Sequence, residues 1–408
     1  MTFKGSLTCL GVLASLLIGG PASAQIENKL IKIGVLTDMA GFSSDSSGKG
    51  SVIAAQMAIE DFGGMLEGVD IKLVSADHQN KADVGASVAK RWIETENVNL
   101  IIDLPISSVA LAVNEVVRNS PKAMMIVNAG GTADLTGEKC SPRTVHWTFD
   151  TWALANGTAR AVLDAGGKSW FFLTADYAFG HALQRDASDV IERTGGKVMG
   201  GVRHPTGISD FSSYLLQAQA SKAQVIGLAN SSNDTAGAIK QAAEFQMTKS
   251  GQQRLAALLM MLSEVHAVGL AAAQGTYLTE AFYWDMNEGT RAFAKRFMQR
   301  TKGVPPTMLQ AGAYASLLHY FKAVKAANSN DGSIVATEMK RIPTDDPLFG
   351  KGTIRADGRK IHDMHLFQVK SPAESKHPWD YYKLVRTIPG DEAFRPLNRG
   401  GCPLVTSN

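Results

Sequence analysis

The 408-residue sequence has no apolar run of the roughly 20 residues that a membrane-spanning helix requires. A shorter apolar run, residues 10–18, follows Lys4 near the N-terminus and precedes the small residues Pro21, Ala22, Ser23 and Ala24. A positive start, a short apolar run and small residues, in that order, are typical of a secretory signal peptide. We therefore expect cleavage after Ala24, which removes residues 1–24 and sends the rest of the chain out of the cytoplasm.

Cysteine is scarce, with three residues in the chain. Cys9 falls inside the expected signal peptide and leaves with it. The mature chain keeps Cys140 and Cys402, and two cysteines in an oxidising compartment predict one disulfide. Two separate buried thiols are the alternative.

Blocks of basic charge are also missing. The formal net charge is +3, and the Lys and Arg residues are interspersed with Asp and Glu. A nucleic-acid-binding surface requires a basic stripe or cluster, so we expect no nucleic-acid partner.

Motifs of reaction chemistry are absent as well. The sequence contains no nucleophile elbow, no H-E-x-x-H and no phosphate-binding loop, and Gly48-Lys49-Gly50 lacks the third glycine of a dinucleotide loop. His362 and His365 lie three residues apart in an expected strand, where their side chains point to opposite faces and cannot share a metal ion. We therefore expect no catalytic residue, no metal and no cofactor, and a binding protein rather than an enzyme.

What the sequence does contain is a regular alternation of short apolar strands and amphipathic helices. Its 45% apolar residues can fill large cores. In the first block the expected strands are 30–36, 70–75, 98–104 and 124–127, with a helical stripe after each of the first three. An irregular break at 139–152 separates this block from a second one, with strands at 169–173, 197–202, 225–228 and 255–262. Helices are expected at 179–193, after an N-cap at Ser209, and at 235–245. This alternation predicts an α/β fold with two doubly wound parallel sheets.

The C-terminal third has a different pattern. Residues 276–284 alternate like a strand, and helices are expected at 288–301 and 307–327. Asp357-Gly358 indicates a hairpin turn before a return strand at 365–370. A Pro-containing tail, residues 379–402, follows.

Ligands of open α/β sheets bind beyond the carboxyl ends of the strands. In the first block these ends are the loops 37–50, 104–108 and 128–132, all rich in Ser, Gly or Thr. Hydroxyls and free backbone N–H groups at such loops suit an anionic group such as a carboxylate, although the same residues also form ordinary caps and turns. The second block offers 176–180, 230–234 and Ser263-Glu264, which supply aromatic rings and an acid. The predicted solute thus has a carboxylate at one end and an apolar or cationic part at the other.

With these segments in place, the chain resembles periplasmic binding proteins of the Leu/Ile/Val type, which serve ABC importers. IKIGVLTDMAG at 31–41 resembles the first strand and loop of that family, and LPISS and NAGGT fall where the family binds the ligand. DYAFG at 176–180 and residues 210–230 resemble its second-lobe units. The resemblance covers nearly all of the mature chain.

The resemblance implies ligand-binding roles for nine residues. Ser107 and Ser108 would contact the ligand carboxylate, and Gly131 and Thr132 would add backbone and hydroxyl contacts. Phe179 would be the second-lobe aromatic residue, Asn230 would contact the solute from the same lobe, and Glu264 would pair with a ligand ammonium. Two departures stand out: the first-loop aromatic of amino-acid binders is replaced by Ser46, beside Asp45, and Leu262-Ser263 replaces Gly-Pro. Relatives that bind aromatic acids or amides therefore remain open alternatives.

The resemblance also implies the architecture and the partners. Lobe 1 is expected to comprise 26–146 and 281–342, and lobe 2 to comprise 147–280 and 343–408, joined by a hinge of three crossings. Cys140 precedes the first crossing, so a bond to Cys402 would hold the tail near the hinge. The expected protein is a periplasmic monomer that closes on a small molecule and delivers it to an inner-membrane ABC permease. A soluble sensor of the same fold is the alternative, and a secreted hydrolase is a weaker one.

Overall fold

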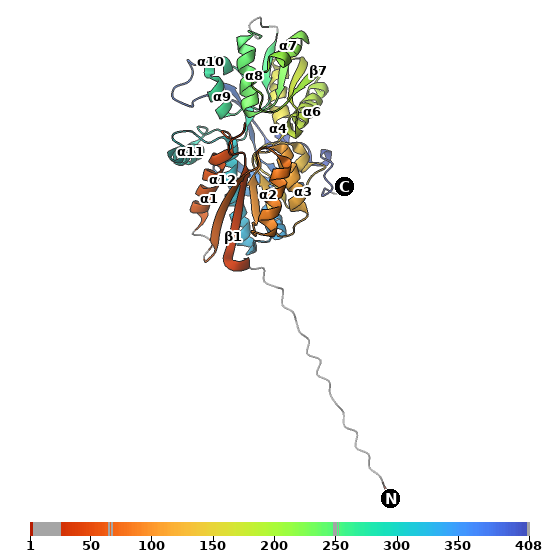
Figure 1. The fold of residues 1–408 in the computed structure, drawn as a ribbon, viewed down its shortest axis with the longest axis vertical. Helices are drawn as coiled ribbons and strands as arrows, with labels where there is room; N and C mark the ends of the chain where they lie inside the picture. Colours follow the sequence, from red (N-terminus) through yellow and green to blue (C-terminus); the bar gives the residue numbers. More distant parts are fainter. Residues whose placement is uncertain (3–25, 64–65, 67, 248–250, 252, 406–408) are drawn as a thin grey trace.

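The computed structural model describes residues 1–2, 26–63, 66, 68–247, 251 and 253–405. The expected signal peptide lies outside the described residues except for its first two. Figure 1 shows two lobes, one above the other, with the N-terminal part of the chain in the lower lobe. Among the described residues, no helix is long and apolar enough to cross a membrane.

The lower lobe, lobe 1, is built on a five-stranded parallel sheet of order β2-β1-β3-β4-β5. Its strands are β1 Leu30–Thr37, β2 Asp70–Asp77, β3 Leu100–Asp103, β4 Met124–Val127 and β5 Thr144–His146. Helices α1 Gly48–Phe62, α2 Ala82–Glu94 and α3 Ser107–Arg118 connect them, and α11 Glu288–Arg300, α12 Met308–Ala327 and α13 Gly332–Arg341 return later in the chain. The central strands are buried along their whole length, which explains their continuous apolar runs.

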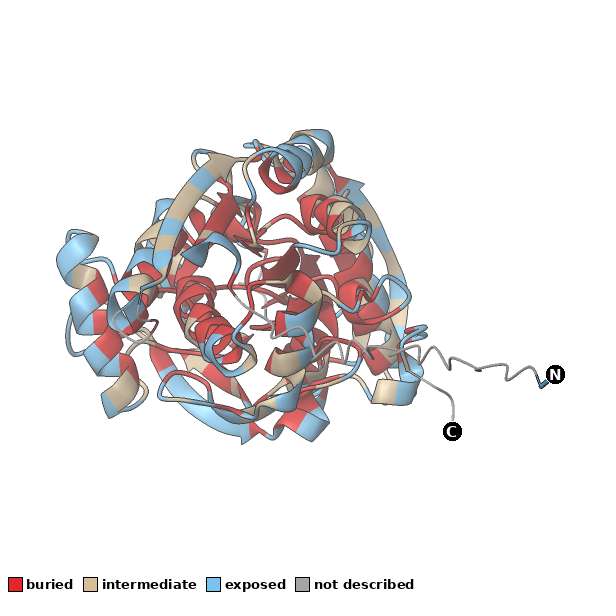
Figure 2. Cartoon of the chain, turned by 90° about the horizontal axis from the view of Figure 1, so that it is seen from below, coloured by how far each residue is buried: buried red, intermediate tan, exposed pale blue. Residues whose placement is uncertain are grey.

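Lobe 2 is built on a four-stranded parallel sheet of order β7-β6-β8-β9. Its strands are β6 Ser169–Ala175, β7 Lys197–His204, β8 Val225–Ala229 and β9 Arg254–Ala257. Its helices are α4 Thr151–Leu154, α5 Arg160–Asp164, α6 Ala178–Arg193, α7 Ser212–Ala220, α8 Ser232–Glu244, α9 Leu262–Val268 and α10 Leu270–Ala273, with a π-helical turn at Ala155–Ala159 between α4 and α5. Figure 2 shows that buried residues concentrate on the strands and the inward faces of the helices.

Two small antiparallel sheets complete the fold. One joins β10 Tyr277–Glu280, β14 Met364–Val369 and β15 Tyr382–Ile388, and the other joins β11 Thr344–Asp346, β12 Gly350–Ile354 and β13 Lys360–Ile361. Short helical turns occur at α14 Gly390–Ala393, η1 Glu27–Lys29, η3 Ala133–Thr136 and η5 Leu397–Arg399. The α/β class with two parallel sheets is therefore as predicted.

The predicted lobe boundaries stay a prediction. The expected third crossing is at 342–343, but the chain forms β11–β13 after that point. His146 of β5 forms a parallel bridge with Arg359, and its backbone N–H donates to the Gly358 carbonyl at 2.9 Å. Because β5 belongs to the lobe 1 sheet, this contact favours a third crossing near residue 362.

Several local predictions differ from the structure. The strand expected at 255–262 ends at Ala257, and Leu262 is instead the first residue of α9. Ser209 is not an N-cap, since α7 begins at Ser212 with Phe211 before it. The irregular break at 139–152 contains the short strand β5, and the strand expected at 276–284 ends at Glu280.

The predicted disulfide is present. Cys140 in lobe 1 is bonded to Cys402, 262 residues later, with the two Cα atoms 5.6 Å apart. Because Cys140 lies four residues before β5, this bond ties the tail that follows β15 to the edge of the lobe 1 sheet. The alternative of two separate thiols is thereby ruled out.

Candidate functional site

A cavity lies between the two lobes, at the carboxyl ends of their parallel strands. From lobe 1 and its connections it is lined by Ser43, Ser46, Pro105, Ala129, Phe149 and Leu309, and from lobe 2 by Tyr177, Phe179, Ser231, Ser232, Leu259 and Met261. Its volume is about 10 Å³, roughly the space for one water molecule. The lobes are therefore closed on each other, and a solute enters only when they part.

Helix N-termini surround this cavity. Ser46 directly precedes the N-cap of α1, Phe179 and Leu309 are the second residues of α6 and α12, and Ser232 is the first residue of α8. Pro105 lies two residues before α3. Each helix N-terminus carries unpaired N–H groups and a partial positive charge, which attract an anion. Among the described residues that line the cavity, none is Lys or Arg.

Aromatic rings form much of the cavity wall. Phe179 is buried in contact with Tyr177, with ring centroids 6.0 Å apart, and Phe42 of lobe 1 meets the Tyr177 ring edge-on at 6.4 Å. Gly131 lies against both Phe149 and Phe179, and a Cβ atom there would come within 2.7 Å of a carbon of each ring. The site therefore combines an apolar, aromatic body with a polar, hydroxyl-rich rim.

A buried acid holds the first loop of lobe 1 in place. Ser47 and Ser51 donate hydrogen bonds to the Asp103 carboxylate, with Ser51 at 2.9 Å. Burial raises the pKa of Asp103 to about 6, partly offset by these hydroxyls. Asp103 and Leu104 both have positive φ, 86° and 60°, which is unusual for residues with side chains. Such strain often concentrates at functional sites.

The predicted lobe 1 residues divide into two groups: Ser46 lines the cavity, whereas Ser107, Ser108, Gly131 and Thr132 are not among the residues that line it in this closed state. The Ser107 hydroxyl accepts a hydrogen bond from the Thr132 backbone N–H at 3.1 Å, so these two predicted residues are neighbours, next to Gly131. Both are fully buried, whereas Ser108 is only partly buried. Ser46 lines the cavity, and its hydroxyl donates to the Ser43 carbonyl at 3.1 Å.

Asp45, beside Ser46, is exposed to solvent and is not among the lining residues. Its backbone carbonyl accepts from the Gln310 amide at 3.4 Å, which fixes the loop against α12.

In lobe 2 only Phe179 of the predicted residues lines the cavity. Asn230 is buried behind the rim, where its side-chain oxygen accepts from the Thr235 hydroxyl at 2.8 Å. Glu264 caps α9: its carboxylate accepts from the Met261 backbone N–H at 2.6 Å and from the Ser263 hydroxyl at 2.9 Å. Burial is the largest cause of the raised pKa of Glu264.

Sequence reasoning missed several lining residues. Ser231 and Ser232 fall inside the strand-end segment that contains Asn230, so a stricter use of the strand-end rule would have named them. Phe149 lies in the stretch 139–152, for which the sequence predicts no regular element, and Leu309 comes from α12, far along the chain. Neither carries a local signal, because both depend on long-range contacts.

The model of the periplasmic binding protein family matches residues 30–376, most of the chain. The chain belongs to the periplasmic binding protein family. This membership confirms the predicted resemblance and the expectation of a binding protein rather than an enzyme.

Solved members of the family share the fold over nearly the whole chain. A periplasmic binding protein from Burkholderia mallei is 49% identical, with a TM-score of 0.90, over 93% of this chain and 100% of that one. A branched chain amino acid ABC transporter periplasmic ligand-binding protein from Burkholderia xenovorans is 39% identical, with a TM-score of 0.81, over 92% and 99%. The Leu/Ile/Val-binding protein homolog 6 of Brucella suis is 24% identical over 92% of this chain and 96% of its own length.

Proposed function

We propose that this protein captures a small organic acid in the periplasm and delivers it to an inner-membrane ABC permease. The observation that carries the proposal is the inter-lobe cavity, where helix N-termini and serine hydroxyls meet aromatic walls. Membership of the family and the 39% identity to an ABC transporter ligand-binding protein support the transport role. The expected signal peptide and the monomeric state are parts of the same proposal.

The site favours an acid with an apolar or aromatic body. We propose that the Ser107–Thr132 pair, with Ser108 and Gly131 beside it, binds the carboxylate, and that Phe179 contacts the body. Asp45 and Asn230 would act on the surrounding loops. Glu264 is buried as the cap of α9 and is not among the residues that line the cavity, so it is poorly placed to pair with a ligand ammonium. This favours an organic acid over an amino acid.

Closure follows from the same arrangement. A solute can drive closure only through contacts that it makes in the closed state and not in the open state. Lobe 1 would bind the carboxylate first, and the aromatic residues of lobe 2 would then cover the body. The permease would recognise the closed form.

Isothermal titration calorimetry with three probes tests the proposal. Benzoate carries the anion and the ring, benzamide is its neutral counterpart of similar shape, and L-leucine adds an ammonium. We expect benzoate to bind at least tenfold more tightly than benzamide, because a buried anion gains more from helix N-termini than a neutral amide does. Equal affinity for benzoate and benzamide, or binding of L-leucine alone, would contradict the organic-acid assignment.

A further inference from the structure

Two of the segments that run between the lobes lie side by side. Residues 146–151 leave β5 for lobe 2, and residues 358–362 run beside them. The His146 N–H donates to the Gly358 carbonyl at 2.9 Å, and the His362 ring nitrogen Nε2 lies 2.9 Å from the Thr148 carbonyl. The two segments therefore form one hydrogen-bonded unit.

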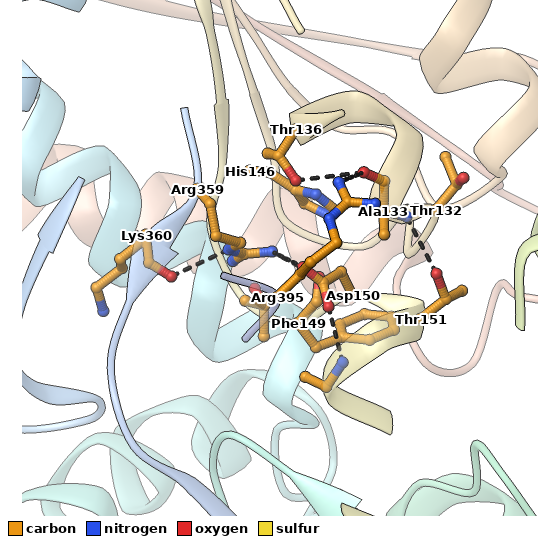
Figure 3. Close-up of polar contacts among 12 residues, drawn as sticks. Thr132, Ala133, Thr136, His146, Phe149, Asp150, Thr151, Arg359, Lys360 and Arg395 are labelled. Carbon is orange, nitrogen blue, oxygen red and sulfur yellow. Dashed lines mark hydrogen bonds and ion pairs between the residues drawn. The ribbon is translucent and has the colours of Figure 1, made fainter. Parts of the chain in front are cut away.

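Arg359 is the centre of this unit and is fully buried. Its Nη1 donates to the Phe149 carbonyl at 2.9 Å, and its Nε donates to the Lys360 carbonyl at 3.0 Å, as Figure 3 shows. The same Nη1 lies 3.6 Å from the Asp150 carboxylate. Burial lowers the pKa of Arg359 to about 10, so the guanidinium keeps its charge at neutral pH.

The residues that Arg359 holds face in different directions. The Phe149 ring lines the cavity and lies against Gly131. The Asp150 carboxylate accepts from the Ala153 N–H at 2.9 Å and so caps α4, the first helix of lobe 2. Residues 149–150 therefore contribute both to the cavity wall and to the cap of the first helix of lobe 2.

The next residue, Thr151, links this segment to both lobes. Its N–H donates to the Gly131 carbonyl at 2.8 Å, and its hydroxyl accepts from the Ala133 N–H at 3.1 Å. The hydroxyl donates in turn to Asp186 of α6 at 2.6 Å. A rotation of lobe 2 against the 131–133 loop would therefore strain these hydrogen bonds of Thr151.

We propose that Arg359 is a positioning residue that holds Phe149 and Asp150 in the closed geometry and thereby couples occupation of the cavity to hinge closure. The proposal rests on the proposed function and adds to it a residue that lies outside the cavity. A solute that presses on the Phe149 ring acts on a backbone whose carbonyl is bound to Arg359. The same guanidinium pairs with the cap of α4, so the ring and the lobe move together.

The C-terminal tail covers the other side of the guanidinium. The Arg359 guanidinium carbon lies 4.6 Å from the centre of the Phe394 ring. The next residue, Arg395, donates to the Ala133 carbonyl at 3.0 Å, and its own carbonyl accepts from Arg355 at 2.8 Å. Packed between the tail and the crossing segment, Arg359 has little freedom to leave its position.

Lys360 provides a matched control. It is adjacent, equally buried and cationic, but its side chain points away from Arg359 in Figure 3. Its Nζ lies 4.3 Å from the centre of the Trp147 ring and 3.8 Å from the Asp346 carboxylate. Replacing Lys360 also removes a fully buried cation, but it leaves the contacts of residues 149–151 in place.

The test measures closure without any solute. Spin labels are attached through Lys81→Cys in lobe 1 and Arg203→Cys in lobe 2, both exposed positions, and their distance distribution is recorded by double electron–electron resonance. We expect Arg359→Met to shift the distribution to longer distances, and Lys360→Met to leave it as in the wild type. Arg359→Lys keeps the charge but lacks the planar donor geometry, so we expect a smaller shift. If Arg359→Met does not fold, the Arg359→Lys variant is measured in its place.

Benzoate titration of the same variants gives the second readout. Arg359→Met should weaken benzoate binding at least tenfold, and Lys360→Met less than threefold, at a temperature where both are folded. Equal shifts in distance for the two methionine variants, or none for either Arg359 variant, would overturn the positioning role. If the wild type fails to bind benzoate, the proposed function falls, while the spin-label distances still decide the role of Arg359.

Discussion

The hydroxyl oxygens of Ser43 in lobe 1 and Ser232 in lobe 2 lie 3.3 Å apart, which joins the lobes at the cavity. Ser232 has φ 55°, although it is not glycine. The closed state thus contains a direct bond between the lobes, made by a residue in a strained backbone conformation.

Substitutions at Ser232 separate the bond from the strain. Ser232→Ala and Ser232→Gly both lose the inter-lobe hydrogen bond, worth about 1 kcal/mol, so affinity should fall about fivefold in each. Glycine adopts positive φ without a steric penalty, so Ser232→Gly should be more stable to unfolding than Ser232→Ala by about 1 kcal/mol. Calorimetry and denaturant titration measure the two effects, and equal stability of the variants would show that the strain is negligible.

Removing the Ser107 hydroxyl should weaken solute binding. Ser107→Ala leaves the buried Thr132 N–H without its acceptor and removes a proposed donor to the carboxylate. The expected loss is about 1–3 kcal/mol, which is roughly 5-fold to 150-fold in affinity. If titration with benzoate gives the wild-type affinity, Ser107 does not belong to the site.

Asp103 makes stability depend on pH. Burial raises its pKa to about 6 in the folded protein, above the value of about 3.9 in an unfolded chain. The unfolded state therefore loses its proton first, and the free energy of unfolding should fall by up to about 3 kcal/mol as the pH rises from 4 to 6. Asp234, whose pKa is also raised to about 6, contributes in the same sense.

The Asp103→Asn variant isolates the contribution of this residue. Its unfolding free energy, measured by urea titration at several pH values, should fall less steeply between pH 4 and 6, with the remainder due to the other buried acids whose pKa is raised, Asp234 and Glu264 among them. A slope identical to that of the wild type would show that Asp103 is ionised normally in the folded protein.

The Cys140–Cys402 bond should stabilise the protein by restricting the unfolded chain. For the sequence separation of 262 residues, the chain-entropy model gives a contribution of about 5–6 kcal/mol. The double variant Cys140→Ser/Cys402→Ser should therefore unfold at lower denaturant concentration. Thiol titration of denatured, unreduced mature protein should find no free thiol, and two free thiols would contradict the bond.

The sequence was most informative where local pattern and burial agree. Met124–Val127 was predicted to the residue, because a fully buried parallel strand reads as an uninterrupted apolar run. The three-residue strand β5 was missed, since it is too short to show a period and is flanked by cysteine and proline. Its pairing depends on β4 and on Arg359, both distant in sequence.

At the site, too, the residues placed by local pattern were predicted and those placed by long-range contacts were not. The strand-end rule found the Ser107 and Thr132 loops, because the carboxyl ends of parallel strands meet at one edge. The capping role of Glu264 was not predicted, since it depends on the backbone of Met261 starting a helix where a strand was expected. Phe149 could not be predicted locally, because Arg359, 210 residues away, fixes its backbone.

Mass spectrometry of solute released by denaturing freshly purified protein tests the central claim most directly. The wild type is compared with Leu309→Trp, in which a larger side chain fills the cavity, after circular dichroism has shown that both are folded. We predict that the wild type releases a small carboxylic acid with an apolar or aromatic body, and that Leu309→Trp releases none. Release of the same solute by both proteins, or of a solute without a carboxylate, would contradict it.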